Sequence, residues 1–272
     1  MTAFNRATTA LFDLLLAPLD RLPALVGIAI LALVSAVLML LVFRATSRQR
    51  ELAAVKRAIQ ADVFEVRLFN DDPAMVIRIQ GAVLRHTFQY LRLSLVPMLW
   101  LVVPLSLVMI QMEFHYGYGG LTPGAPALVT VSLPGENTLH DPGGVSLEAP
   151  AAIRVASPAV LFPTLRQVTW SVVPESRGAF ELRIRTAGGT YLKSVVVSDT
   201  WERRSPRRQG PGLVEQILYP SEPPLPPGAQ VGAIEVAYPS RRPVGNLHWS
   251  VLYLGLCVAF SVALRSPLGV AI

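Results

Sequence analysis

The chain has 272 residues, of which 52% are hydrophobic and only 15% are charged, and its mean hydropathy is +0.46. Soluble domains carry about 25% charged residues, so this composition excludes a disordered protein and disfavours a wholly soluble enzyme. The net charge is +6, but the basic residues are dispersed without a nucleic-acid-binding motif, so nucleic acid is not an expected partner. The apolar residues gather instead in long uncharged runs, which is typical of membrane-spanning helices.

An interfacial helix is expected before the first of these runs. Leucines recur in residues 1–22 around Asp13 and Asp20, which is the pattern of an amphipathic helix that lies in the membrane interface. Pro18 and Pro23 separate it from the first span.

Three runs are long enough to cross a bilayer. Residues 24–43 and 93–112 are each twenty residues without a charge, and residues 247–264 are eighteen. A helix needs roughly 20 apolar residues to cross the hydrocarbon core, with about 17 as the lower limit. We therefore expect three transmembrane helices, of which the second contains two candidate helix kinks, Pro97 and Pro104.

The distribution of basic residues predicts how the spans are oriented. The segment between the first two spans carries nine, whereas the segment before the first span has only Arg6 and Arg21, beside two aspartates. Short basic loops stay in the cytoplasm, so we expect the N-terminus outside and the C-terminus inside a bacterial inner membrane. The arginines that follow the first span argue against a cleaved signal peptide. The nine residues are Arg44, Arg48, Arg50, Lys56, Arg57, Arg67, Arg78, Arg85 and Arg92.

These features divide the chain into six segments. Between the spans we place a cytoplasmic helical hairpin and an extracytoplasmic β-rich domain. In chain order the segments are an interfacial N-terminal helix (1–22), span one (23–44), the hairpin (45–92), span two (93–113), the β-rich domain (114–246) and span three with a short cytoplasmic tail (247–272).

The cytoplasmic segment is predicted to form two amphipathic helices. Apolar residues recur at intervals of three and four from Leu52 to Val66, and again from Val76 to Leu91. A turn at Asn70, Asp71 and Asp72 separates the two runs, with Asp72 as an N-cap and Pro73 at the first helical position. This is an αα-hairpin, and we expect its helices to continue into the first two spans without a break.

The outer segment predicts a compact antiparallel β-sandwich of immunoglobulin-like size, because short β-rich runs there are separated by Gly and Pro. Trp170 alternates with Val168 and Val172 and is expected in the core. Gly188 and Gly189 predict a hairpin, and residues 213–218 fit a short helix or an edge strand. The expected strands are residues 127–133, 151–156, 166–173, 179–186, 190–197 and 231–238.

Chemistry-bearing motifs are absent from the sequence. It contains no nucleotide-binding loop, nucleophile elbow or zinc-protease motif, so we expect no enzyme activity and no cofactor. Glu113 and His115 follow the second span, and we interpret them as a polar collar with Tyr116 and Tyr118. The single cysteine, Cys257, excludes an intrachain disulfide. Metal binding is not expected, because the histidines are widely spaced: His86, His115, His140 and His248.

Two groups of polar residues are candidate sites. Arg92, at the inner start of span two, either snorkels to the interface or lines a wet indentation between helices. A basic loop after residue 200 suits anionic lipid headgroups or a partner, with a merely solvated loop as the alternative. The candidate groove residues are Arg92, Ser94, Ser106, Gln111 and Ser35, and the candidate outer basic patch is Arg203, Arg204, Arg207 and Arg208.

Three blocks of sequence carry a family resemblance: residues 43–49 before the hairpin, residues 93–98 with Pro104, and residues 249–253 with Ser261 and residues 264–270. With the three-span layout they resemble the YidC-type membrane insertase superfamily. Its minimal members, the archaeal YidC-like proteins and the insertase subunit of the endoplasmic-reticulum membrane complex, are the most similar in layout.

The resemblance implies a membrane insertase or membrane chaperone with a lipid-exposed polar groove. Membrane lipids and other membrane proteins, as clients or complex subunits, would be the partners, and no nucleotide hydrolysis would be needed. The chain differs from the family in its inserted β-rich domain and in lacking an arginine within a span.

Two alternatives remain beside the insertase. One is a membrane-anchored structural or interaction subunit whose outer β-domain binds a partner protein, for which exposed edge strands are suited. The other is a membrane enzyme, which is disfavoured because no catalytic constellation can be assembled from the residues.

Overall fold

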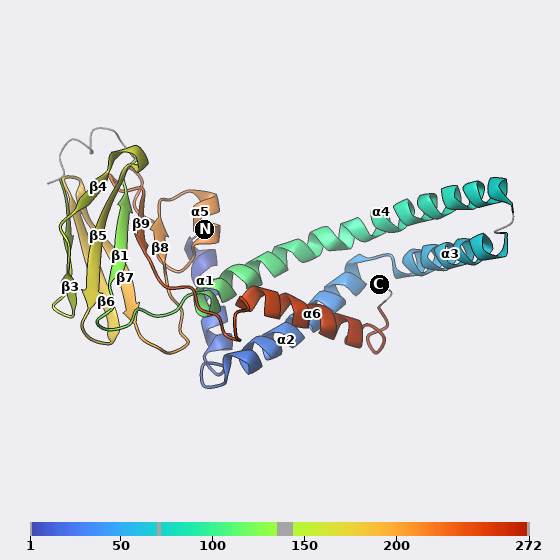
Figure 1. Cartoon of the computed structure of the whole chain (residues 1–272), viewed down its shortest axis with the longest axis horizontal. Helices are drawn as coiled ribbons and strands as arrows, with labels where there is room; N and C mark the ends of the chain where they lie inside the picture. Colours follow the sequence, from blue (N-terminus) through green and yellow to red (C-terminus); the bar gives the residue numbers. More distant parts are fainter. Residues whose placement is uncertain (1, 70–71, 135–143, 271–272) are drawn as a thin grey trace. The chain divides into compact units, whose positions relative to one another are not determined.

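The computed structural model describes residues 2–69, 72–134 and 144–270 (Figure 1). Three residues named above, His140, Asn70 and Asp71, lie outside the described residues. The chain forms two compact units. Unit 1 comprises Met1–Gly27 and Met109–Ser250, and unit 2 comprises Ile28–Val108 and Val251–Ile272.

Unit 2 contains all or most of each of four helices. Two of these helices are long and apolar enough to cross a membrane. These are α2 (Ala24–Thr46) and α4 (Pro73–Met112). The third expected span is a shorter apolar helix, α6 (Trp249–Leu264), of 16 residues. At 1.5 Å per residue α6 is about 24 Å long, against about 30 Å for a hydrocarbon core.

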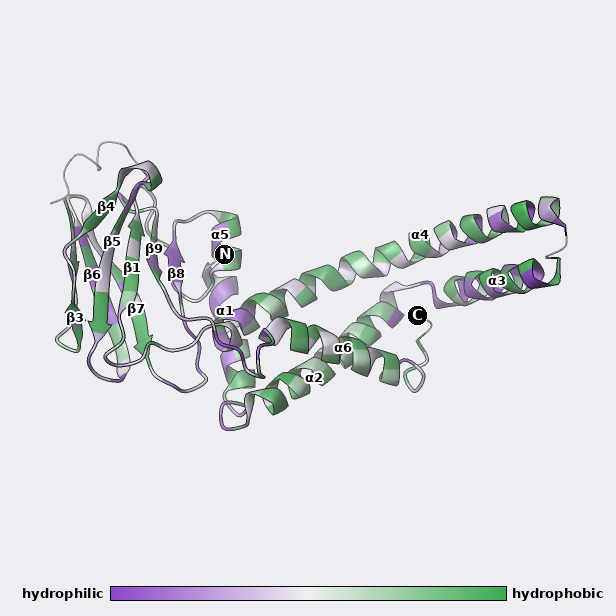
Figure 2. Ribbon diagram, viewed as in Figure 1, coloured by the Kyte–Doolittle hydropathy of each residue, from purple (hydrophilic) through white to green (hydrophobic). Residues whose placement is uncertain are grey.

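The apolar half of α4 is almost bare within the described chain. Only 6% of its most apolar window is buried, and Trp100 and Val103 are 63% and 71% exposed. Figure 2 shows this half and most of α2 and α6 in the green and white of hydrophobic and neutral residues, and residues 93–112 contain no charged residue on any side of α4. A helix that is apolar all round needs an apolar environment to cover it.

The helical hairpin is formed by α3 (Gln49–Leu68) and the first half of α4. Asp72 caps α4 as predicted, because its carboxylate accepts the backbone N–H groups of Ala74 and Met75 at 2.9 and 3.2 Å. Pro73 is the first residue of the helix, where its missing N–H costs nothing.

The expectation that both hairpin helices continue into the spans holds for α4 and is wrong for α3. Helix α4 continues from the hairpin to Met112, whereas α2 ends at Thr46 and α3 begins at Gln49. The hydroxyl of Thr46 donates to the carbonyl of Val42 at 2.7 Å, and Arg48 has a non-helical backbone. Hydroxyl side chains that bond to the backbone favour such breaks.

Unit 1 combines helical elements with two β-sheets. The helical elements include α1 (Thr2–Leu16), a π-helical turn that extends α4 (Glu113–Gly117), a 3-10 turn (Pro163–Leu165) and α5 (Leu213–Leu218). Residues 213–218 thus form a short helix and not an edge strand, the two structures that their sequence allowed.

All strand pairs in the two sheets are antiparallel, as predicted. The larger sheet has the order β3-β5-β1-β9-β8, with β4 also paired to β5, and the smaller has the order β2-β6-β7. The strands are β1 (Ala127–Ser132), β2 (Val145–Glu148), β3 (Ile153–Val155), β4 (Val160–Phe162), β5 (Gln167–Pro174), β6 (Gly178–Thr186), β7 (Gly189–Val197), β8 (Arg207–Gln209) and β9 (Ala233–Val236).

Both sheets contribute to one hydrophobic core. Val129 lies opposite Trp170 in the larger sheet, and Trp170 is 4% exposed, as its alternation predicts. Ile184 and Val195 enter the same core from the smaller sheet. The hairpin predicted at Gly189 joins β6 to β7. The φ of Gly189 is 137°, a positive value that glycine adopts readily.

Candidate functional site

A cavity of about 470 Å³ lies in unit 2 beside the break between α2 and α3. Helix α4 lines it with Gln89, Arg92, Leu93 and Val96, which recur at helical spacing and therefore share one face. The opposite wall consists of Thr46, Arg48 and Glu51.

This cavity is amphipathic. Arg48 and Glu51 form an exposed ion pair at 3.4 Å, and among the described residues Arg92 has no hydrogen bond or ion pair. Arg92 is followed directly by Leu93, the first residue of the long uncharged run. In the described part of the chain, an unpaired and exposed guanidinium therefore lies at the boundary between the hairpin and the apolar half of α4.

The other four candidate groove residues do not line this cavity. Ser94 is half-buried, and its hydroxyl has no hydrogen-bond partner in the described part of the chain. Ser106 is exposed on α4. Gln111 is 1% exposed and belongs to unit 1. Ser35 is buried in α2 and interacts with Tyr253 of α6.

Ser35 takes part in a close contact between α2 and α6. Ala32 and Ala36, on the same face of α2, are fully buried, and the thiol of Cys257 donates to the carbonyl of Ala32 at 3.6 Å. Small residues allow two helix backbones to approach closely. Ser35 therefore lies in the packed contact between α2 and α6.

Neither proline interrupts α4, which runs as one helix through both positions. Pro97 is buried and Pro104 is exposed. Each lacks the N–H that would bond to the carbonyl four residues earlier, so the carbonyls of Leu93 and Trp100 lose a helical partner.

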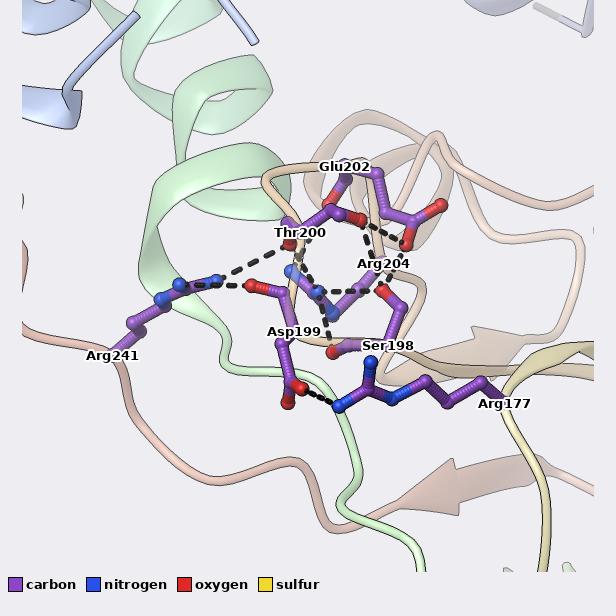
Figure 3. A network of polar contacts seen from close by, with 7 residues as sticks. All are labelled: Arg177, Ser198, Asp199, Thr200, Glu202, Arg204 and Arg241. Atoms are coloured by element: carbon purple, nitrogen blue, oxygen red, sulfur yellow. Dashed lines mark hydrogen bonds and ion pairs between the residues drawn. The ribbon is translucent and has the colours of Figure 1, made fainter. Parts of the chain in front are cut away.

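Arg204, one of the four candidate arginines of the outer loop, is completely buried in unit 1. Its guanidinium donates to the carbonyls of Tyr118 at 3.0 Å, Glu202 at 3.2 Å and Thr200 at 2.7 Å (Figure 3). It also reaches the carbonyl and hydroxyl of Ser198, both at 3.3 Å. Arg204 thus holds the loop after β7 in shape.

The other three arginines are also engaged within unit 1. Arg203 pairs with Asp13 of α1 at 2.6 Å and is 13% exposed. Arg207 lies 3.9 Å from Glu235, and Arg208 donates to two backbone carbonyls. The four side chains therefore connect parts of the domain and do not form one common exposed surface.

Two further arginines brace the same loop from outside. Arg241 donates to the carbonyls of Asp199 and Thr200 at 3.1 and 3.2 Å, and its guanidinium lies 3.7 Å from the ring centre of Trp201. Arg177 pairs with the carboxylate of Asp199 (Figure 3). Burial lowers the pKa of Arg241, with Asp199 acting in the opposite direction.

His115, three residues beyond the end of α4, is buried against Asp20, with 2.9 Å between Nε2 and Oδ1. Burial lowers the pKa of His115 to about 4, and the charge of Arg203 adds to this effect. Burial also raises the pKa of Asp20, as do Glu202 and Asp13. At neutral pH the histidine is therefore uncharged. His115 and Tyr116 are 3% and 1% exposed, so these two collar residues lie inside unit 1.

Sequence reasoning missed a buried ion pair in the β-domain. Lys193 of β7 is 0% exposed, and its ammonium lies 2.6 Å from Glu222 and 2.5 Å from the carbonyl of Ser205. Burial lowers the pKa of Lys193, whereas Glu222 raises it. The sequence did carry a signal for the burial of Lys193, because Lys193 alternates with Tyr191 and Val195 on the inward side of the strand.

Comparison of the chain with models of protein families, with curated proteins and with solved structures gives no match. The described residues also contain no group of three His, Cys, Asp or Glu side chains suited to a metal ion. A functional proposal therefore depends on the cavities, charges and exposed surfaces of this chain.

Proposed function

We propose that the protein is a YidC-like insertase or membrane chaperone of a bacterial inner membrane. In this proposal α2, α4 and α6 are three spans, the hairpin is cytoplasmic, and the β-domain and N-terminus lie outside. The cavity at Arg92 is the observation that carries the proposal, because it joins an exposed positive charge to the start of an exposed apolar helix.

The cavity offers a chemical reason for such an activity. A hydrophilic client segment loses its hydration when it enters a bilayer, and polar groups at the edge of the hydrocarbon core lower that cost. Arg92 and Gln89 would supply hydrogen bonds to the segment, while Leu93 and Val96 would contact its apolar neighbours. A bilayer thinned around the short α6 would lower the cost further.

Crosslinking tests whether clients enter the cavity. A photoreactive residue at position 92 is expected to capture nascent membrane segments, because it replaces a side chain of the cavity wall. Leu95 is the matched control, since it lies on α4 near Arg92, is 55% exposed and does not line the cavity. Equal capture from both positions, or capture of lipid alone at position 92, would contradict the proposal.

Reconstitution tests whether the charge matters. We expect Arg92→Ala to reduce insertion of clients with short hydrophilic tails into vesicles, and Arg92→Lys to retain most of it. Arg85→Ala removes an arginine from the same helix outside the cavity and is expected to leave insertion unchanged. Normal insertion by the Arg92→Ala variant would show that the charge of Arg92 is not needed for insertion.

A second candidate function, partner binding by the β-domain, is favoured by an apolar groove of about 370 Å³ on the larger sheet. Phe162 and Leu165 line it and are 45% and 63% exposed. Replacing both with serine is expected to abolish co-purification of a partner and leave client insertion intact. If insertion fails and co-purification persists, partner binding at this groove is excluded.

A further inference from the structure

Helix α4 carries a narrow apolar stripe on the exposed side of the helical hairpin. We call this stripe the outer seam, and it consists of Ile77, Gly81, Leu84, Phe88 and Leu91. Its four apolar side chains are 59–72% exposed. Helix α3 contacts a different side of α4, where Nδ1 of His86 lies 2.6 Å from Oδ2 of Asp62 and Ile79 is buried. The described part of the chain therefore leaves the outer seam uncovered.

The spacing of the outer seam is that of a coiled coil. A heptad repeat with apolar a and d positions alternates steps of three and four residues, and from Ile77 to Leu91 the steps are four, three, four and three. At about 100° per residue these positions cover roughly 80° of the helix circumference, whereas a helix that packs on a broad apolar surface shows a stripe of about 100° or more. The pattern therefore favours a second helix over a lipid surface as the occupant.

Gly81 supports close approach of another helix. A Cβ at this position would meet nothing within 4 Å among the residues that the structure describes, and Gly81 does not have a positive φ. Glycine inside a helix is destabilising relative to alanine, so no contact or backbone conformation within the chain explains it. On a helix–helix interface, a missing side chain leaves room for a bulky side chain of the partner.

One flank of the outer seam is positively charged. Arg78 and Arg85 directly follow Ile77 and Leu84, so they take the e positions of the same heptads. Both are exposed, and within the described ranges neither has a hydrogen bond or an ion pair. Residues 73–112 contain no Asp or Glu. Charges at e positions select partner helices of opposite charge, so the matching helix carries carboxylates along its flank.

A second copy of the chain fits the outer seam poorly. Two copies in one membrane are parallel, and in a parallel pair each seam residue meets its own counterpart. Phe88 would face Phe88 and Gly81 would face Gly81, whereas well-packed interfaces set large side chains against small ones. Such a pair would also bring no carboxylate to Arg78 or Arg85, because α4 has none.

We propose that the outer seam binds an α-helix of another protein, one with an apolar heptad stripe and carboxylates along its flank. A bulky apolar side chain of that helix fills the space at Gly81, and a small one faces Phe88. A groove of about 430 Å³ adjoins the seam at Leu84 and extends the apolar contact toward Val63 of α3. Neither the seam residues nor Arg85 line the cavity at Arg92, so this proposal does not rest on client insertion.

Binding is tested on the full chain in nanodiscs of zwitterionic lipid, with a fluorescent peptide of three heptads as the probe. The peptide has Leu at a and d and Glu at e and g, because Glu on both flanks keeps it from pairing with itself. Fluorescence anisotropy is expected to show saturable binding with a dissociation constant of about 10 µM. A peptide with Lys in place of Glu, and one with its apolar residues shuffled out of heptad order, are expected to bind about tenfold more weakly.

Variants of the apolar residues test the seam itself. Leu84→Ala with Phe88→Ala shortens two exposed side chains and is expected to weaken binding about tenfold. Acidic peptides with Trp or Ala at each apolar position in turn test the space at Gly81. One position is expected to favour Trp over Ala about tenfold, and Gly81→Leu is expected to remove that preference.

Charge reversal tests the basic flank. Arg78→Glu with Arg85→Glu is expected to weaken binding of the acidic peptide about tenfold and to let the Lys peptide bind, a gain that a misfolded protein would not show. Arg50→Glu with Arg57→Glu is the matched control, because these arginines are exposed on α3, are also seven residues apart and give the same change in net charge. The control is expected to change binding by less than about twofold.

Each outcome supports or overturns the proposal. Saturable binding that both seam variants weaken and the α3 control does not supports it. Equal binding by all variants overturns it, as does an equal loss in the control, which would indicate a general attraction to the basic hairpin. A dimer of the chain alone that Leu84→Ala with Phe88→Ala dissociates would assign the seam to a second copy and overturn it.

A dye on Phe88→Cys, in a Cys257→Ser background, tests lipid as the occupant. A shift of its emission to that of an apolar environment when anionic lipid is added, without peptide, would assign the seam to the membrane surface and overturn the proposal. An unchanged emission supports it. None of these measurements involves client insertion, so this proposal and the insertase proposal fail separately.

Discussion

At the residue scale, the buried charged residues of unit 1 can be tested by single substitutions. Lys193 gives the clearest test. We expect Lys193→Met to lower the free energy of unfolding by about 3–5 kcal/mol, because it leaves the carboxylate of Glu222, only 10% exposed, without its partner. Replacing both residues, as Lys193→Met with Glu222→Leu, is expected to restore most of that loss. Chemical unfolding followed by circular dichroism measures both. A double variant as unstable as the single one would show that the pair itself stabilises the fold.

The pH dependence of unit 1 is a second residue-scale prediction. The pKa of His115 falls from 6.5 to about 4 in the folded state, so between these values the unfolded chain binds a proton that the folded chain does not. Stability is therefore expected to fall as the pH drops from 6.5 to 4, by about 3 kcal/mol at most. The raised pKa of Asp20 acts with the opposite sign and reduces this loss.

Unfolding temperatures of the wild type and of His115→Gln, measured from pH 7 to pH 4, check this prediction. The variant has no imidazole to protonate, so its profile is expected to be flatter. Asp20→Asn is the matched control and is expected to steepen the acid loss. Parallel profiles for all three proteins would show that His115 does not contribute.

The arginines show where sequence reasoning stops at this scale. Their place in one loop was readable, and the interpretation as an exposed patch followed from their spacing. Arg204 is buried because carbonyls from residues 198–202 and from Tyr118 surround it, and Arg203 because α1 supplies Asp13. Tyr118 and Asp13 are distant in sequence from these arginines, so no local pattern reports those two contacts.

At the element scale, the contact between α2 and α6 depends on small side chains. We expect Ala32→Leu to destabilise the chain by about 1–3 kcal/mol, because the larger side chain must separate two helices that meet at Ala32 and Cys257. Val34→Leu adds a methylene to the same helix at a position that is 51% exposed, and it is expected to be neutral. Thermal unfolding in detergent compares them, and equal losses would show that the contact is loose.

Elements with a strong local signal were predictable from the sequence, and those without one were not. All six expected strands are present within a few residues, and Asp72 and Pro73 begin α4 as expected. The short strands β2, β4 and β8 were not predicted, and each of them exists because a neighbouring strand pairs with it. At the cavity, the sequence likewise indicated only Arg92 as a candidate residue. The cavity itself was not predictable, because its far wall depends on the break after Thr46.

At the scale of the whole molecule, the insertase layout requires that α6 crosses the membrane. Its length of about 24 Å falls short of a full hydrocarbon core, and the difference is accommodated only if the bilayer thins or flanking residues extend the span. The segment after α6 packs back on unit 2, where Val270 joins Leu40, Phe43 and Leu52 in one cluster, and Arg44 donates to the carbonyl of Leu268 at 3.0 Å. Leu268 and Val270 thus lie beside the junction of α2 and α3, which is the cytoplasmic side in the proposed orientation.

Labelling of single cysteines with an impermeant maleimide on intact cells tests this topology, in a Cys257→Ser background. We expect Ser176→Cys, exposed in the β-domain, to be labelled from outside, and Gln60→Cys, exposed on α3, to be labelled only after the membrane is opened. Ser266→Cys, exposed just after α6, decides the number of spans. With three spans it behaves as Gln60→Cys does, and with two it behaves as Ser176→Cys does. A two-span result would place residues 264–270 on the β-domain side, away from the hairpin, and would contradict the packing of Val270 against Leu52 as well as the insertase layout.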